Sequence, residues 1–141
     1  MKSLKIGICG VGNVGGAVLD TLEKNPEIIQ NQGGVKLEAI LVGARKGKSA
    51  VTNKDLNVVT DLKEVAASEE IDVFVELIGG TDLAKELVET AINNGKHVVT
   101  ANKALIASHG DALFKLAKEN GVQIGFEASV AGGTPVIKAL R

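Results

Sequence analysis

The sequence has one cysteine, very few aromatic residues, no excess of charge and no long apolar run. With a single cysteine among 141 residues, an intrachain disulfide and a cysteine-based zinc cluster are excluded. Tryptophan and tyrosine are absent, and three phenylalanines form no platform on which nucleic-acid bases could stack. The net charge of −1 also argues against a nucleic-acid binder, which is normally strongly basic. No apolar run reaches the roughly 18 residues of a membrane-spanning helix, so we expect no membrane partner.

The remaining composition is that of an ordinary globular protein. The apolar content is 45% and the charged content 23%, and residues 1–141 are long enough to form one domain with its own core. The N-terminus shows no signal-peptide pattern, so we expect a cytoplasmic protein, with Cys9 as a small buried hydrophobic residue of the first strand. The nucleophile-elbow and P-loop motifs are both missing, which excludes the hydrolases and ATPases built on them.

Glycine is abundant, with 17 residues, and three of them form a G-x-G-x-x-G turn. The turn follows an apolar run and opens a helix-like segment at residues 14–24, the setting of a dinucleotide-binding turn. In that setting the first glycine turns the chain, the second admits a pyrophosphate, and the third lets helix and strand pack closely. A plain strand–turn–helix is the alternative. The six candidate cofactor-binding residues here are Gly10, Val11, Gly12, Asn13, Val14 and Gly15.

Apolar strand patterns and amphipathic helix patterns alternate along the whole chain. This alternation predicts an α/β fold with a doubly wound, mostly parallel, Rossmann-like sheet in a single domain. Its candidate ligand groups follow the strands, where the carboxyl ends of parallel strands meet. The expected strands are residues 5–9, 35–42, 57–60, 72–78, 96–100 and 122–126, and the expected helices are residues 14–24, 62–67, 81–93 and 110–119, with a last one from residue 134.

The tip of the second strand indicates which dinucleotide binds. An NAD site usually has an acidic residue there for the ribose hydroxyls, whereas an arginine suits the extra phosphate of NADP. The tip has no acidic residue but has Arg45, Lys46 and Lys48. Arg45 lies further from the glycine turn than the usual ~20 residues, because the preceding loop is long. We therefore favour NADP over NAD, although a solvated basic loop would have the same composition.

Three strings in the second half of the chain are more specific than the glycine turn. They are Glu-Leu-Ile-Gly-Gly at residues 76–80, Val-Val-Thr-Ala-Asn-Lys-Ala-Leu at 98–105 and Phe-Glu-Ala-Ser-Val-Ala-Gly-Gly-Thr-Pro at 126–135. In this order, and with the turn before them, they resemble homoserine dehydrogenase over essentially the whole chain. The resemblance implies an enzyme of threonine, methionine and isoleucine biosynthesis that interconverts L-aspartate 4-semialdehyde and L-homoserine with NAD(P)H.

The same resemblance implies roles for individual residues. Val11, Asn13 and Val14 are similar to backbone contacts of the cofactor, and Arg45 to the partner of its 2′-phosphate. Lys103 resembles the lysine beside nicotinamide and substrate, and is the candidate catalytic residue. The floor of the nicotinamide site would be Gly79, Gly80 and Thr100. A loop for a monovalent cation such as sodium would use Glu127 and the backbone oxygens of Val130, Gly132 and Thr134, since oxygen atoms suit a hard cation.

The resemblance also sets limits on what this chain is expected to do. Members of the family continue well beyond the position of Arg141, with the substrate pocket, most contacts of a homodimer and a second lysine. We therefore expect the chain alone to bind cofactor with little turnover. Other reductases of this fold, such as aspartate dehydrogenase or dihydrodipicolinate reductase, are an alternative that the strings at 98–105 and 126–135 disfavour. A nucleotide-sensing domain without chemistry is a second alternative.

Four polar residues have competing interpretations. Lys103 could act in chemistry or be a solvated lysine where a helix starts. Glu76, on an otherwise apolar strand, needs a partner or a water-filled cleft, and could bond the backbone of a neighbouring loop or contact ligand. We expect His97, at a strand start, and His109, in a loop, to be structural or exposed.

Overall fold

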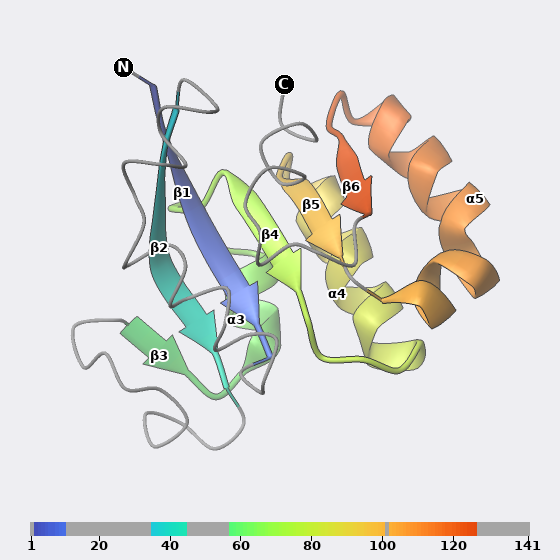
Figure 1. The fold of residues 1–141 in the computed structure, drawn as a ribbon, viewed down its shortest axis with the longest axis horizontal. Coiled ribbons are helices and arrows are strands. Elements are labelled where there is room, and N and C mark those ends of the chain that lie inside the picture. The colour runs from blue at the N-terminus through green and yellow to red at the C-terminus, as the bar shows by residue number, and fades with distance from the viewer. Residues whose placement is uncertain (1, 11–34, 45–56, 101, 127–141) are drawn as a thin grey trace.

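A computed structural model describes residues 2–10, 35–44, 57–100 and 102–126. Strands and helices alternate over this part of the chain (Figure 1). The strands are β1 Lys2–Cys9, β2 Val35–Gly43, β3 Asn57–Val59, β4 Val73–Glu76, β5 His97–Thr100 and β6 Ile124–Phe126. The helices are α3 Leu62–Ala66, α4 Asp82–Asn93 and α5 Lys103–Glu119. The helices expected at residues 14–24 and from residue 134 lie outside the described residues.

The six strands form one sheet in the order β3-β2-β1-β4-β5-β6. Every neighbouring pair is parallel, and the arrowheads in Figure 1 all point the same way. From β1 the chain builds outward to β3, then returns across the sheet and builds outward from β4 on the other side. This confirms the doubly wound parallel fold expected from the sequence.

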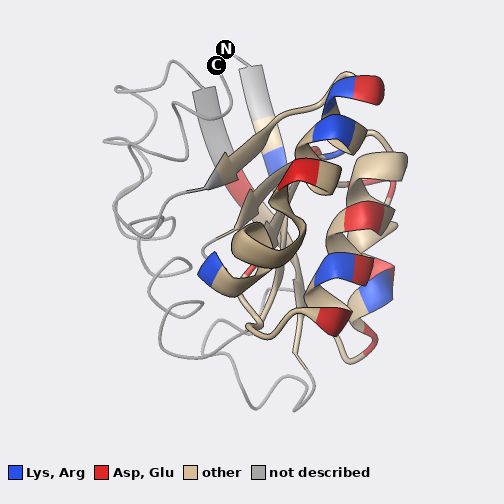
Figure 2. Ribbon diagram, turned by 90° about the vertical axis from the view of Figure 1, so that its right-hand side faces the viewer, with Lys and Arg blue, Asp and Glu red and all other residues tan. Residues whose placement is uncertain are grey.

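The described helices lie together on one face of the sheet (Figure 2). The crossovers through α3, α4 and α5 all move across the sheet in the same direction, and parallel crossovers are almost always right-handed, so the three helices share a face. Acidic and basic positions are interspersed along these helices (Figure 2). No helix in the described segments is long and apolar enough to cross a membrane.

Among the described residues, one hydrophobic core cluster lies between this helical layer and the sheet. All four residues of β4 are buried, as its nearly continuous apolar sequence predicts for a strand covered on both faces. Two glycines let α3 approach β1 and β2. A Cβ atom on Gly7 would lie 2.8 Å from Val65 Cγ1, and one on Gly43 would lie 2.8 Å from Leu62 Cδ2. A larger residue at either position would therefore require the packing of α3 against the sheet to rearrange.

The buried face of α4 has the spacing of an amphipathic helix. Ala84, Leu87, Val88, Ala91 and Ile92 are buried, and Leu83 is partly buried and packs against the same core cluster.

The start of α5 was placed too late. It begins at Lys103 instead of residue 110, because Asn102 caps it: the Asn102 side-chain oxygen accepts the Leu105 N–H at 3.0 Å. His109, expected in a loop, consequently lies within this helix, while His97 does begin β5. The glycine at position 110 is buried inside the helix and does not start it.

Strand ends differ by a few residues from the predicted ranges, for local reasons. β4 ends at Glu76 instead of residue 78, because the Glu76 carboxylate takes the Ile78 N–H and turns the chain. β6 begins at Ile124 because the Val122 N–H donates to Ala117 at the end of α5. β1 extends back to Lys2, which pairs with Val35.

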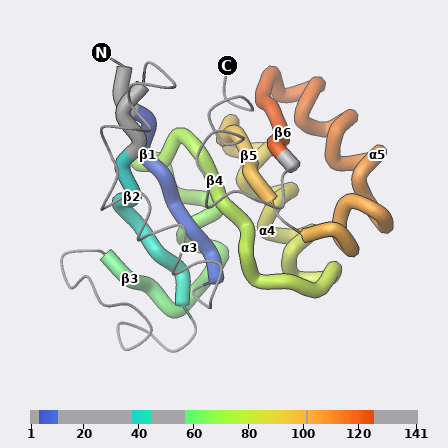
Figure 3. Tube along the Cα trace, viewed as in Figure 1, coloured from blue at the N-terminus to red at the C-terminus, as the bar shows by residue number. Residues whose placement is uncertain are grey.

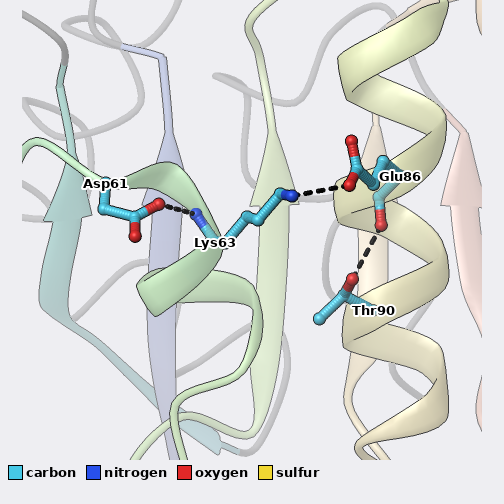
Figure 4. Close-up of polar contacts among 4 residues, drawn as sticks. All are labelled: Asp61, Lys63, Glu86 and Thr90. Carbon is cyan, nitrogen blue, oxygen red and sulfur yellow. Dashed lines mark hydrogen bonds and ion pairs between the residues drawn. The ribbon is translucent and has the colours of Figure 1, made fainter.

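Side chains of α3 and α4 join the two helices at the surface (Figure 4). Asp61 caps α3 by accepting the Lys63 N–H at 3.0 Å. Lys63 Nζ reaches Glu86 Oε1 on α4 at 2.6 Å, and this contact raises the pKa of Lys63. Both side chains are more than half exposed, so the pair contributes little to stability.

Candidate functional site

The carboxyl ends of β1, β4 and β5 lie side by side at one edge of the sheet (Figure 3). Cys9 pairs with Glu76, and Glu76 with Thr100, so the last residues of the three strands form one row. Strand order reverses between β1 and β4, and in doubly wound sheets the crevice at such a reversal is where ligands bind. The described part of the candidate site is formed by the segments that follow this row.

Gly10 is the first of these, and its position requires glycine. Its φ angle is +98°, and a Cβ atom there would lie 2.7 Å from both the carbonyl carbon and oxygen of Leu77. Its N–H donates to the Gly43 carbonyl at 3.1 Å, and the Leu77 N–H donates to the Cys9 carbonyl at 2.9 Å. The chain therefore turns sharply out of β1 in close contact with the segment after β4, as expected for the first glycine of the turn.

Glu76 is fully buried at the end of β4 and has three hydrogen-bond donors. Its Oε2 accepts the N–H groups of Ile78 at 2.9 Å and Gly79 at 3.3 Å, and its Oε1 accepts the Thr100 hydroxyl at 2.7 Å. Of the interpretations left open for Glu76, the structure confirms bonding to the backbone of the next loop.

Thr100 and Asn102 continue this network to the next strand end. The Thr100 hydroxyl donates to Glu76 and accepts the Asn102 N–H at 3.0 Å, and Thr100 is 1% exposed. The side-chain amide of Asn102 donates to the Gly80 carbonyl at 2.6 Å, while its oxygen caps α5. The loop after β4 and the start of α5 are thus held by the same side chains.

Gly79 and Gly80 lie on the solvent side of this network. Both have positive φ angles, +78° and +72°, and a Cβ atom on either would meet nothing within 4 Å. Both residues are exposed. Their backbone therefore forms an open surface beside the reversal of strand order, where a ligand can approach closely.

Lys103 is the first residue of α5 and is exposed. The N-terminal end of a helix carries a partial positive charge, so a lysine there is unfavourable by a few tenths of a kcal/mol, and the first turn of α5 has no acidic residue to offset it. Both charges favour an anionic or electron-rich group at this edge of the sheet.

Cys9 lies beneath the site and is unsuited to react there. It is fully buried, and its thiol lies 3.5 Å from the Leu62 carbonyl. Burial, with smaller contributions from the Glu76 and Asp61 carboxylates, raises its pKa to about 12, so the nucleophilic thiolate is suppressed. This agrees with its expected role as a small core residue. Among the described residues, no three His, Cys, Asp or Glu side chains are grouped to hold a metal ion.

The structure brings together five of the residues selected from the sequence: Gly10, Gly79, Gly80, Thr100 and Lys103. The others lie outside the described residues: Val11, Gly12, Asn13, Val14, Gly15 and Arg45 for the cofactor, and Glu127, Val130, Gly132 and Thr134 for the cation.

One member of the network was missed as a functional residue. Asn102 stands beside Lys103 at a strand end but was given no role of its own, although an asparagine before an apolar helical pattern is a recognised capping signal. The partner of its amide, the Gly80 carbonyl, lies 22 residues away in sequence and no local pattern indicates it.

These features define a class of protein. A parallel sheet in the order 3-2-1-4-5-6, with a glycine turn after β1 at the reversal of strand order, is the Rossmann-type dinucleotide-binding fold.

Comparisons with known proteins identify the family. Residues 10–127 match the model of the NAD-binding domain of homoserine dehydrogenase. The homoserine dehydrogenase of Pseudomonas aeruginosa is 52% identical over 141 residues, which are 100% of this chain and 32% of that protein. The crystal structure of a homoserine dehydrogenase from Thiobacillus denitrificans has a TM-score of 0.84 and 44% identity, covering 99% of this chain and 32% of that one.

The chain belongs to the homoserine dehydrogenase family and corresponds to its nicotinamide-dinucleotide-binding domain. It spans about a third of the length of these relatives. A hyperthermophilic archaeal homoserine dehydrogenase in complex with NADPH is also similar, with a TM-score of 0.74 and 28% identity over 90% of this chain and 44% of that one.

Proposed function

We propose that this chain binds NADP(H) across the reversal of strand order, as the cofactor domain of an enzyme that interconverts L-aspartate 4-semialdehyde and L-homoserine. The observation that carries the proposal is the close packing of Gly10 against the segment after β4, beside the open backbone of Gly79 and Gly80. In this fold the pyrophosphate lies at the turn after the first strand and the adenosine half extends toward the second. The nicotinamide half then extends toward residues 77–80 and the start of α5.

The preference for NADP over NAD is part of this proposal, and Arg45 is its proposed cause. A guanidinium group suits a 2′-phosphate, and a similar archaeal protein forms a complex with NADPH. Fluorescence titration of the chain with NADPH and NADH tests it. Arg45→Ala should weaken NADPH binding about tenfold, the value of one charge-assisted bond, and NADH binding by less than about twofold. Lys118→Ala, in the last turn of α5, is the matched control for a lost cation. Equal loss of NADPH and NADH in Arg45→Ala would remove Arg45 from this role.

Lys103 is the proposed catalytic residue of the longer protein. The cofactor supplies the hydride, and an ammonium group on the nicotinamide side can polarise the aldehyde oxygen that accepts it. Its position at the positive end of α5 costs stability, which favours a role other than capping. Lys103→Ala in a full-length protein should abolish most homoserine oxidation; unchanged turnover would favour the nucleotide-sensing alternative.

Further features follow from the family resemblance. We propose that residues 1–141 act as one domain, that Glu127, Val130, Gly132 and Thr134 bind a monovalent cation such as sodium, and that the longer protein is a cytoplasmic homodimer. Because the chain spans about a third of its relatives, we expect turnover to require residues outside this sequence. Homoserine oxidation by the 141-residue chain measures this directly, and robust activity would contradict it.

A further inference from the structure

Glu76 is a charged side chain in a place where packing alone would favour an apolar one. Its neighbours on β4 are valine and phenylalanine, and it is 0% exposed. A buried carboxylate is costly unless it is hydrogen-bonded, and its three bonds offset that cost. All three bonds go to segments at the candidate site.

These bonds form a closed path through two loops. The Glu76 carboxylate accepts hydrogen bonds from the Gly79 N–H and from the Thr100 hydroxyl. Thr100 accepts the N–H of Asn102, and Asn102 returns to the loop by donating to the Gly80 carbonyl. Gly79 and Gly80 each have a positive φ angle, which a glycine pair reaches freely but does not hold by itself. The side chains around the path therefore fix the conformation.

We propose that Glu76 is a positioning residue for the nicotinamide half of the bound dinucleotide. It fixes the backbone of Gly79 and Gly80 against the start of α5. It thereby also fixes the position of Lys103, the first residue of that helix. Glu76 itself does not touch the ligand. This inference rests on the proposed function, since it concerns the same site. It assigns Glu76 to this end of the ligand, because its bonds to described residues go to the loop after β4 and to Thr100.

The decisive variant is Glu76→Gln, which keeps the shape of the side chain but replaces one acceptor oxygen with an amide donor. Whichever way the amide lies, at least one of the three bonds that Glu76 accepts is lost or reversed in direction. NADPH and 2′-phospho-ADP-ribose, the same molecule without nicotinamide, are titrated against the 141-residue chain. We expect NADPH to bind about tenfold more weakly and 2′-phospho-ADP-ribose to change by less than about twofold.

The ratio of the two affinities separates positioning from stability. A lower folded fraction weakens both ligands by the same factor, so a purely structural role leaves the ratio unchanged. The emission of bound NADPH is a second readout, which should move toward that of the free cofactor in Glu76→Gln. An unchanged ratio in Glu76→Gln overturns the inference. If the wild-type chain binds neither ligand, the proposed function is overturned as well. That result is distinguishable from an unchanged affinity ratio, which overturns only the role of Glu76.

Thr100 provides a second test that does not depend on the folding of Glu76→Gln. Thr100→Val keeps the shape and removes the hydroxyl that links Glu76 to Asn102, so it should also change the affinity ratio. Thr100→Ser keeps the hydroxyl and should restore the wild-type ratio. Thr90→Val is the matched control, since it removes a hydroxyl that donates to Glu86 within α4. Equal ratios in Thr100→Val and Thr90→Val would contradict the inference.

Discussion

At the scale of single residues, Gly10 is the glycine, among those in the described segments, at which a Cβ atom would lie closest to neighbouring backbone. Gly10→Ala combines an unfavourable φ of +98° with a Cβ atom 2.7 Å from the backbone of Leu77. Both costs are of order 1–3 kcal/mol, so we expect a loss of about 3 kcal/mol in the free energy of unfolding. Gly95→Ala is the control, because Gly95 has a similar φ of +77° with open space around it, and should cost about 1 kcal/mol. Chemical denaturation of both variants gives the comparison, and equal losses would contradict the close contact at Gly10.

Cys9 gives a prediction for alkaline pH. Its pKa is raised from 9.0 to about 12 in the folded chain, so above pH 9 the unfolded chain loses its thiol proton while the folded chain keeps it. Stability from this group is complete below pH 9 and decreases up to pH 12, by at most about 4 kcal/mol for three pKa units. The chain has no tyrosine to titrate in the same range. Wild type and Cys9→Ala differ in their free energy of unfolding, and this difference should become smaller from pH 9 to 12. A difference that stays constant over this range would contradict the raised pKa of Cys9.

How far the sequence predicts single residues depends on where their partners lie. The burial of Cys9 follows from its place in an apolar run. The surroundings of Glu76 do not, because its partner Thr100 is 24 residues away and meets it only after both strands enter the sheet. Residue type alone therefore left Glu76 open between a structural role and ligand contact.

At the scale of elements, Asn102 has two roles that substitutions can separate. It caps α5, and it donates a hydrogen bond to the loop after β4. Asn102→Ala removes the cap of α5 and the donor to the Gly80 carbonyl, and should cost about 2–3 kcal/mol of stability. Asn102→Asp keeps a capping oxygen but places a carboxylate oxygen against the Gly80 carbonyl oxygen, which repels it, so it should weaken NADPH binding although α5 keeps its cap. Asp61→Ala, at the exposed cap of the short helix α3, is the control and should cost about 1 kcal/mol. Equal effects of Asn102→Ala and Asp61→Ala on thermal unfolding would contradict the double role.

Elements were predictable where their pattern is local. All six described strands and the end of α4 at Asn93 follow from apolar runs and from the glycine that comes soon after the helix. The start of α5 did not, because Gly110 inside the helix resembles a start signal. The end of β4 was also misplaced, because it depends on a side-chain bond from Glu76 to Ile78 that the apolar run does not reveal.

At the scale of the whole molecule, the reversal of strand order creates the site. β1 and β4 are neighbours in the sheet although β2, β3 and α3 separate them in the chain. Alternating strands and helices predict a parallel sheet, and the glycine turn favours this winding, but strand order is set by tertiary packing. The sequence therefore predicted which loops carry the site, whereas their contacts, such as Gly10 against Leu77, came only from the structure.

The central claim is that one dinucleotide lies across this reversal, with its pyrophosphate at the turn that begins with Gly10 and its nicotinamide half beside Gly79, Gly80 and Lys103. Amide chemical shifts of the ¹⁵N-labelled 141-residue chain, titrated with NADPH and then with 2′-phospho-ADP-ribose, test it most directly. We predict that NADPH shifts the amides of all four residues, and that 2′-phospho-ADP-ribose shifts Gly10 but leaves the other three near their free positions. Identical shift patterns for both ligands, or none at Gly10 with either, would contradict the claim.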